Sequence, residues 1–62
     1  MDVASLADLL KEAADQHHHY EATAPEHEWS AWYAAYVNAR EQGSSPEEAY
    51  TAARAFVESA PP

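Results

Sequence analysis

Histidine and carboxylate side chains lie close together in one short stretch, at a spacing that metal binding can use. His17 and Glu21 are four residues apart, and His27 follows after a proline. Residues four apart share one face of a helix, so two such side chains can reach the same ion. Zinc accepts three ligands of this kind plus a water. These three residues are therefore the candidate metal ligands, although the chain has no HExxH or paired ExxH pattern.

A structural role explains the same histidines. Neighbours in a helix diverge by about 100°, so the consecutive His17, His18 and His19 cannot form one ligand set. We expect His17 to pack edge-on against a tryptophan, and His18 and His19 to be solvated. On this interpretation the protein needs no metal and no other cofactor.

Catalysis has weak support in the sequence. His17 is a conceivable general base near neutral pH, with Glu21 orienting it. The chain has no cysteine nucleophile, however, and its serines have helix-capping or surface explanations. A chain of 62 residues also offers little depth for a substrate pocket of about 300–1,000 Å³. We therefore predict that the protein is not an enzyme.

Aromatic rings recur at helical spacing after residue 28. They form one helical face, which serves either as a core stripe or as a binding surface. A face that two flanking helices cannot cover is an exposed apolar patch, and such patches mark interfaces. A cage of rings beside acidic residues also attracts a cation. The candidate partner- or ligand-binding residues are Trp29, Trp32, Tyr33, Tyr36, Tyr20 and Arg40.

Composition restricts the partners. Eleven acidic residues against three basic ones give a net charge of −8, which opposes binding to nucleic acid and to anionic membranes. A basic protein surface or a small cationic ligand is electrostatically acceptable. No apolar run approaches the roughly 20 residues that cross a bilayer, and the first residues do not resemble a secretory signal. We therefore expect a cytoplasmic protein.

Three amphipathic segments must position these side chains. The first helix is predicted over residues 5–21, with Ser5 and Asp8 in a capping-box arrangement. The second is predicted over residues 25–42, starting either near Pro25 or only at Glu28, with Gly43 as the C-cap.

The third helix has the clearest local signal. Ser45 is a capping residue, Pro46 suits the first turn, and Glu48 completes a capping box, so a helix over residues 46–59 is predicted. No segment has the alternation of a strand.

The predicted fold is therefore all-α: residues 1–62 form one small three-helix domain with short connections. An alternative is that the third helix swings out and docks on a partner or another copy. Glu12 is predicted on the water-facing side of the first helix. The predicted core consists of Leu6, Leu9, Leu10, Ala13, Trp29, Trp32, Tyr33, Tyr36, Tyr50, Ala53, Phe56 and Val57.

Most of the chain resembles a known group of proteins. Residues 6–10, 17–21, 27–36 and 43–49 are similar to short actinobacterial-type proteins, and tails of larger ones, labelled as bleomycin resistance or glyoxalase-related proteins. The Trp-x-x-Trp-Tyr block and the Ser-Pro-Glu-Glu segment are its specific parts. The resemblance implies a small helical accessory unit that accompanies a larger domain. It implies no metal ligands or drug groove, because that superfamily builds them from βαβββ modules that this chain cannot form.

Three functions follow as hypotheses. The first is a small acidic accessory protein that acts by association with itself or with a larger protein. The second is a module that sequesters a small cationic ligand on the aromatic and acidic face. The third is a histidine-carboxylate metal protein that uses His17, Glu21 and His27.

Overall fold

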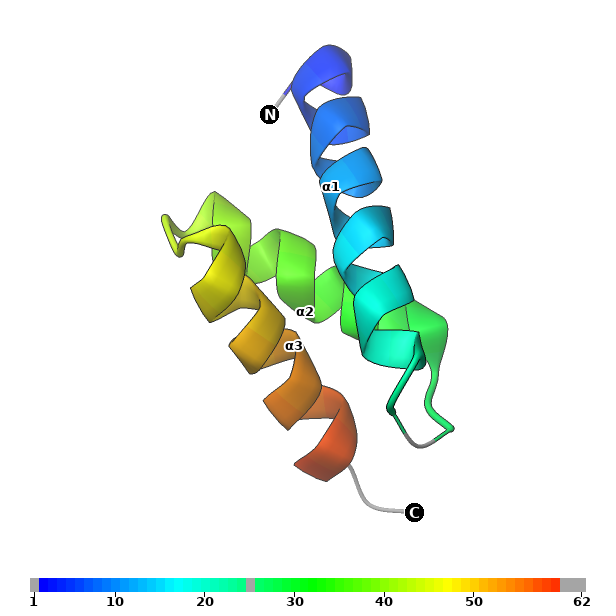
Figure 1. Ribbon diagram of the computed structural model, residues 1–62. Helices are drawn as coiled ribbons and strands as arrows, with labels where there is room; N and C mark the ends of the chain where they lie inside the picture. The colour runs from blue at the N-terminus through cyan, green and yellow to red at the C-terminus, as the bar shows by residue number, and fades with distance from the viewer. Residues whose placement is uncertain (1, 25, 60–62) are drawn as a thin grey trace.

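Three helices connected by short turns make up the fold (Figure 1). The computed structural model describes residues 2–24 and 26–59. Helix α1 spans Val3–Glu21, α2 spans Trp29–Glu41 and α3 spans Pro46–Ser59, and the described residues contain no strand. The predicted all-α three-helix fold is confirmed. Predictions that concern residues 25 and 60–62 lie outside the described residues.

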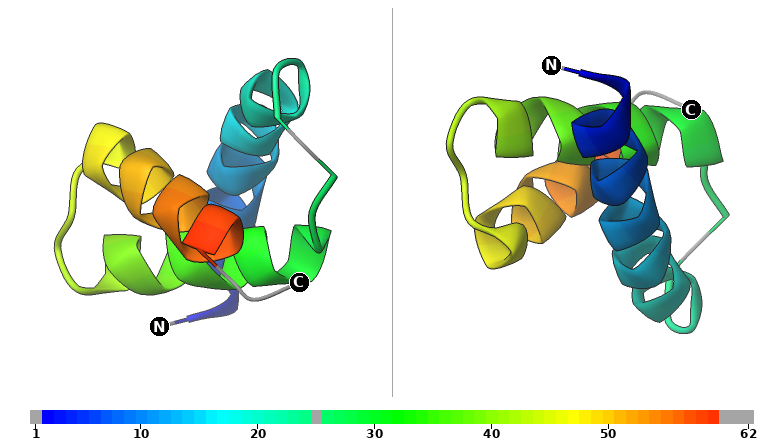
Figure 2. Two further views of the ribbon diagram at one scale, coloured as in Figure 1. Left: turned by 90° about the horizontal axis from the view of Figure 1, so that it is seen from below. Right: turned by 90° about the horizontal axis from the view of Figure 1, so that it is seen from above.

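The helices are arranged as a pair with a third helix across it. Helices α2 and α3 pack side by side in roughly opposite directions, and α1 crosses them (Figure 2). The first turns of α1 project beyond both other helices, and the molecule has an extent of 34 Å along its long axis against 20 and 18 Å across (Figure 1). In the described part of the chain, no helix is long and apolar enough to span a membrane.

The beginning of α1 differs from the prediction, and the beginning of α2 agrees with one of its two predicted alternatives. Asp2, not Ser5, caps α1, because its backbone is extended and its Oδ1 accepts a hydrogen bond from the Ser5 backbone nitrogen at 3.0 Å. Helix α2 begins at Trp29, after the extended Glu28. The later of the two predicted starting points is therefore the observed one.

The turn between α2 and α3 follows the sequence signals closely. Gly43 has a φ of 99°, a left-handed conformation that favours glycine. The backbone nitrogens of Gly43 and Ser44 donate to the carbonyls of Arg40 and Ala39, which is a Schellman motif. The Ser45 backbone nitrogen donates to the Glu48 carboxylate at 2.8 Å, and the Glu48 nitrogen donates to Ser45 Oγ at 3.1 Å. This predicted capping box is confirmed.

Aromatic stacking dominates the core. Trp32 and Tyr36 are fully buried and lie parallel, with ring centroids 5.3 Å apart. Tyr20 of α1 stacks on Trp32 at 5.8 Å. Alanines at the crossing points let the helix backbones approach each other. The buried apolar residues are Ala13, Tyr20, Trp32, Tyr36, Ala39, Ala49 and Ala53.

Four residues predicted in the core are exposed instead. Leu6 and Leu10 are 39% and 43% exposed, Trp29 is 63% exposed and Phe56 is 55% exposed. The two leucines lie where α1 extends toward the free end of the arm, so the helices cover them only in part. Helical periodicity identifies an apolar face, but it does not show whether another helix lies opposite that face. The core prediction is wrong for these four residues.

Candidate functional site

His17 is the buried titratable side chain at the junction of α1 and α2. It is 5% exposed and lies against the rings of Trp32 and Tyr33, at centroid distances of 5.1 and 5.0 Å. Its Nε2 is 2.9 Å from Nε2 of His27, and its Nδ1 is 3.3 Å from Oε1 of Glu21. The Glu21 carboxylate favours a proton on Nδ1, and we therefore assign His27 Nε2 as the donor to His17 Nε2.

The three predicted metal ligands are neighbours, but they do not surround one point. Glu21 meets one ring nitrogen of His17, whereas His27 meets the other. Among the described residues, no group of three or more His, Asp or Glu side chains is arranged to hold a metal ion. The geometry is instead a carboxylate–histidine–histidine chain that ties the end of α1 to the following turn. The predicted packing of His17 against a tryptophan is confirmed.

Acid is expected to weaken this junction. Burial lowers the pKa of His17 below its ordinary value of 6.5, the Glu21 charge opposes that shift, and His27 adds to it. A lowered histidine pKa means that the unfolded chain takes up the proton first. The stability present above pH 6.5 is therefore lost as pH falls through the folded-state pKa, by at most about 1.4 kcal/mol per pH unit. Urea unfolding between about pH 7.5 and 5.5 measures this slope.

Exposed histidines of the same helix supply the control for this prediction. The double variant His18→Gln, His19→Gln removes two solvated rings and is expected to keep the slope, whereas His17→Gln is expected to lose it. A slope that disappears with His18 and His19, or that is absent from the wild type, contradicts the assignment to His17.

A small hollow lies beside this junction. Its volume is about 240 Å³, and it is lined by Glu21, Ala24, Glu26, His27 and Trp29. The Trp29 ring packs edge-on against Tyr33 at a centroid distance of 5.7 Å while most of its surface stays exposed. We call this feature the Trp29 hollow. Sequence analysis missed Glu26 as a lining residue, because its position depends on the path of the turn.

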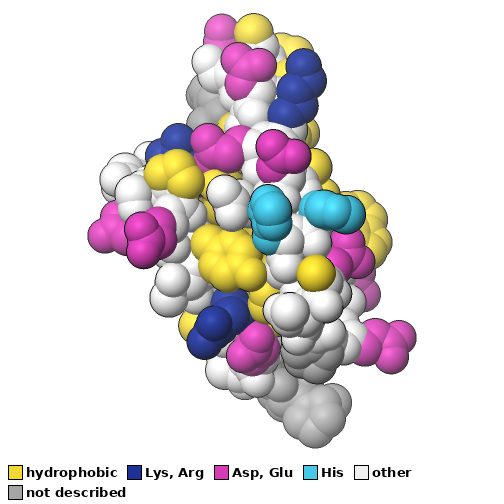
Figure 3. Space-filling model, viewed as in Figure 1, with side chains coloured by type: hydrophobic (Ala, Val, Ile, Leu, Met, Phe, Trp, Pro, Cys, Tyr) yellow, Lys and Arg dark blue, Asp and Glu magenta, His cyan; other side chains and the backbone are white. Residues whose placement is uncertain are grey.

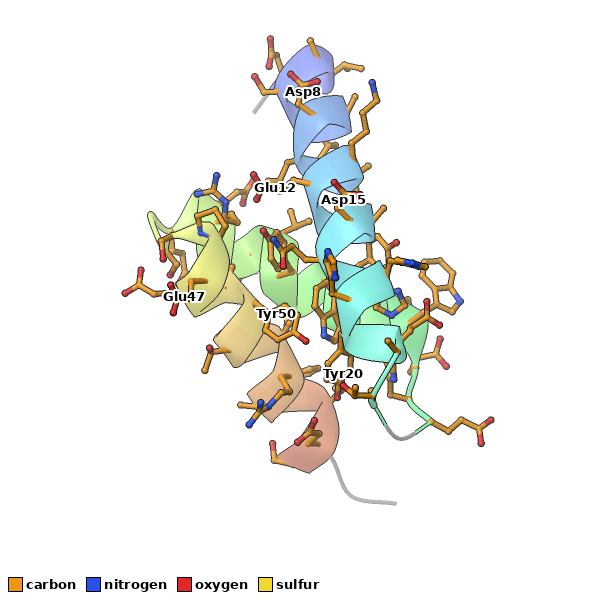
Figure 4. All side chains as sticks on the ribbon, viewed as in Figure 1. Asp8, Glu12, Asp15, Tyr20, Glu47 and Tyr50 are labelled. Atoms are coloured by element: carbon orange, nitrogen blue, oxygen red, sulfur yellow. The ribbon has the colours of Figure 1, made fainter. Side chains whose placement is uncertain are left out.

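A second polar cluster joins α1 to the end of α2. Glu12 Oε2 accepts hydrogen bonds from the Tyr36 hydroxyl at 2.6 Å and from Arg40 Nε at 2.7 Å. Arg40 Nη1 also donates to the Ser44 carbonyl at 2.9 Å. In Figure 4 the Glu12 side chain extends from α1 toward this end of α2. The prediction of a water-facing Glu12 is wrong, since α1 crosses the pair so that Glu12 reaches a buried phenol.

Tyr20 joins α1 to α3 at the opposite end of the crossing. Its hydroxyl donates to Glu58 at 2.7 Å, and Arg54 lies 3.9 Å from the same carboxylate oxygen. Burial and the hydrogen bond to Glu58 raise the pKa of Tyr20 to about 12. Figure 4 shows Tyr20 pointing from α1 toward α3. Tyr20 is therefore part of the core and of a structural contact.

The six predicted partner- or ligand-binding residues divide into three groups. Tyr20, Trp32 and Tyr36 are buried, so a surface ligand does not reach them without a rearrangement. Tyr33 and Arg40 are half-buried and contact neighbouring helices or turns. Trp29 presents most of its ring to solvent.

The remaining exposed apolar surface includes a line of residues on the free half of α1. Val3, Leu6 and Leu10 follow each other at helical spacings of three and four, so they share one face. Val3 is 85% exposed. We call these three residues the apolar stripe.

Comparisons with family models, with curated proteins and with solved structures find no match. The apolar stripe and the Trp29 hollow are the candidate binding surfaces. The resemblance to bleomycin resistance-labelled proteins stays a prediction.

Proposed function

We propose that the protein is a small acidic interaction protein that docks on a larger protein through the apolar stripe of α1. The exposure of Val3, Leu6 and Leu10 is the observation that carries this proposal. Scattered exposed apolar residues are ordinary, whereas a continuous line of them on one element is typical of an interaction site.

The shape of the arm favours a helical or grooved partner. The first turns of α1 project beyond α2 and α3, so a partner has access to them (Figure 1). Residues at i, i+3 and i+7 are the anchors by which an amphipathic helix lies in an apolar groove. Each leucine that becomes fully buried contributes roughly 1.5–3 kcal/mol of transfer free energy before ordering costs.

Charge indicates a basic partner rather than a second copy. Hydrophobic, acidic and basic side chains all appear on the projecting part of the molecule (Figure 3). A basic partner surface suits the excess of acidic side chains in this chain. Two copies of this chain would each carry a charge of −8, which opposes self-association.

A photo-crosslinking amino acid in place of Leu10 tests the proposal. We expect one protein with a basic, apolar surface to be crosslinked in the cells that make this chain, and the purified pair to bind directly. Because Leu10 contributes buried area, Leu10→Ser is expected to weaken that binding at least about tenfold. Titration calorimetry measures the affinity, and circular dichroism checks that the variant is folded.

Thr51 on the exposed side of α3 is the matched control position. Identical adducts from positions 10 and 51 contradict the proposal, as does unchanged affinity of Leu10→Ser for the purified partner. Crosslinks that join only copies of this chain contradict the choice of a larger partner.

A further inference from the structure

The Trp29 hollow combines an exposed indole with acidic side chains. Glu21 and Glu26 line it from the end of α1 and from the turn, and Trp29 lines it from the first residue of α2. Among the described residues, neither lysine nor arginine lines the hollow. A cation placed there meets two carboxylates that no neighbouring lysine or arginine of the lining neutralises.

The exposed indole is in contact with a neighbouring ring. Trp29 packs edge-on against Tyr33, and Tyr33 packs on the buried His17, so a chain of rings connects the hollow to the core. A ring held this way loses little conformational entropy when a ligand stacks on it. A stacked cation gains from the negative face of the ring.

The partial charges of the two helix ends beside the hollow oppose each other. The N-terminus of α2 carries partial positive charge and disfavours a cation, whereas the C-terminus of α1, where Glu21 lies, carries partial negative charge and favours one. The carboxylates of Glu21 and Glu26 therefore decide the sign of the local potential.

We propose that the Trp29 hollow binds a guanidinium group, stacked on Trp29 and paired with Glu26 and Glu21. A guanidinium is flat, so it can stack on an indole, and its fork of N–H donors matches a carboxylate. The volume of about 240 Å³ is below the 300–1,000 Å³ of sites that enclose whole drug-sized ligands. The hollow thus takes a head group, which belongs either to a small molecule or to an arginine side chain of a protein.

This site is separate from the proposed docking surface. The apolar stripe lies within residues 3–10, and the hollow lies within residues 21–29, at the other end of α1. A variant that loses binding at one of these sites is therefore expected to keep binding at the other.

Titration of the full chain with agmatine, followed by the two indole N–H signals in nitrogen-15 NMR spectra, tests the proposal. We expect the Trp29 signal to shift and saturate at roughly millimolar concentration, while the signal of the buried Trp32 stays in place. The same titration with the peptide acetyl-Gly-Arg-Gly-amide distinguishes the two sources. Tighter binding of agmatine supports a free ligand, and tighter binding of the peptide supports a protein side chain.

Three variants separate local recognition from general attraction to an acidic chain. Glu26→Gln is expected to weaken binding about two- to fivefold, and so is Trp29→Leu, for which the backbone N–H signals of the residues around the hollow replace the missing indole signal. Glu41→Gln removes the same charge from an exposed position that does not line the hollow, and it is expected to bind like the wild type.

Two results overturn the proposal. One is a Trp29 signal that does not move with either probe. The other is equal weakening by Glu41→Gln and Glu26→Gln, which attributes the attraction to net charge alone.

Discussion

Replacement of Trp32 by alanine is expected to unfold most of this protein. The side chain is fully buried, and Trp→Ala changes in protein cores cost about 3–5 kcal/mol. A chain of 62 residues has a total stability of roughly 3–9 kcal/mol at 0.05–0.15 kcal/mol per residue. The expected loss is thus comparable with the total free energy of unfolding of the protein. Circular dichroism during thermal and urea unfolding measures it.

The position of Trp32 explains why this effect is large. Its ring packs against five others that come from all three helices, with centroid distances from 5.1 to 6.0 Å. Removal of the indole therefore opens a cavity at the point where α1 crosses the pair, and a small domain has little other buried area to compensate. The five rings belong to His17, Tyr20, Tyr33, Tyr36 and Tyr50.

Trp32→Phe and Trp29→Ala are the matched controls. The indole nitrogen of Trp32 is buried and has no hydrogen-bond acceptor among the described residues, so phenylalanine keeps a stacked ring and removes a costly polar group. We expect Trp32→Phe to cost only about 1–2 kcal/mol. Trp29→Ala removes an exposed ring and is expected to cost about 0.5 kcal/mol. A Trp32→Ala protein as stable as Trp29→Ala would show that the stacked core is not the basis of the fold.

Replacement of Glu12 by alanine is expected to cost about 2 kcal/mol. The change leaves the Tyr36 hydroxyl, which donates to Glu12 at 2.6 Å, without its acceptor. It also removes the carboxylate that receives Arg40 Nε at 2.7 Å. Asp15→Ala removes one acid from an exposed site on the same helix (Figure 4) and is expected to change stability by no more than about 0.5 kcal/mol.

A double-mutant cycle isolates the hydrogen bond. In a Tyr36→Phe background the buried hydroxyl is absent, so Glu12→Ala is expected to cost about 1 kcal/mol less. Equal costs of Glu12→Ala in both backgrounds would contradict a contribution from this contact.

The pH dependence gives a second measure of the same cluster. Hydrogen bonds from Arg40 and then from Tyr36 lower the pKa of Glu12 below its ordinary 4.5. A lowered carboxyl pKa stabilises the folded state above the unfolded value, and this stabilisation is lost as pH falls through the folded-state pKa. Glu12→Ala is expected to remove this component of acid unfolding. An acid-unfolding curve identical to that of the wild type would contradict it.

The sequence predicted local structure well because its signals act over a few residues. Ser45, Pro46, Glu48 and Gly43 fixed the α2–α3 turn by capping and by left-handed backbone geometry, and the structure confirms each role. The error at the start of α1 has the same origin. Asp2 and Ser5 are both good capping residues, and propensity alone does not rank two candidates three residues apart.

The site could be predicted only in part. The proximity of His17 and Glu21 followed from helical spacing, and the contact with His27 was a hypothesis that the structure supports. The pairing of Glu12 with Tyr36 spans 24 residues and left no pattern in the sequence. Glu21 and His27 contact opposite nitrogens of the His17 ring, which argues against a three-ligand metal site. This arrangement depends on side-chain directions, which the sequence does not specify.

The amino-acid sequence by itself determined the helical class, the bounds of α3 and the sign of the charge, because these depend on periodicity, capping and composition. The tertiary structure decided which apolar residues are covered. Leu9 and Leu10 are adjacent in one helix, yet only Leu9 packs against the core. Successive side chains of a helix point about 100° apart, and the way α1 crosses the other helices directs Leu9 toward the core and Leu10 toward solvent.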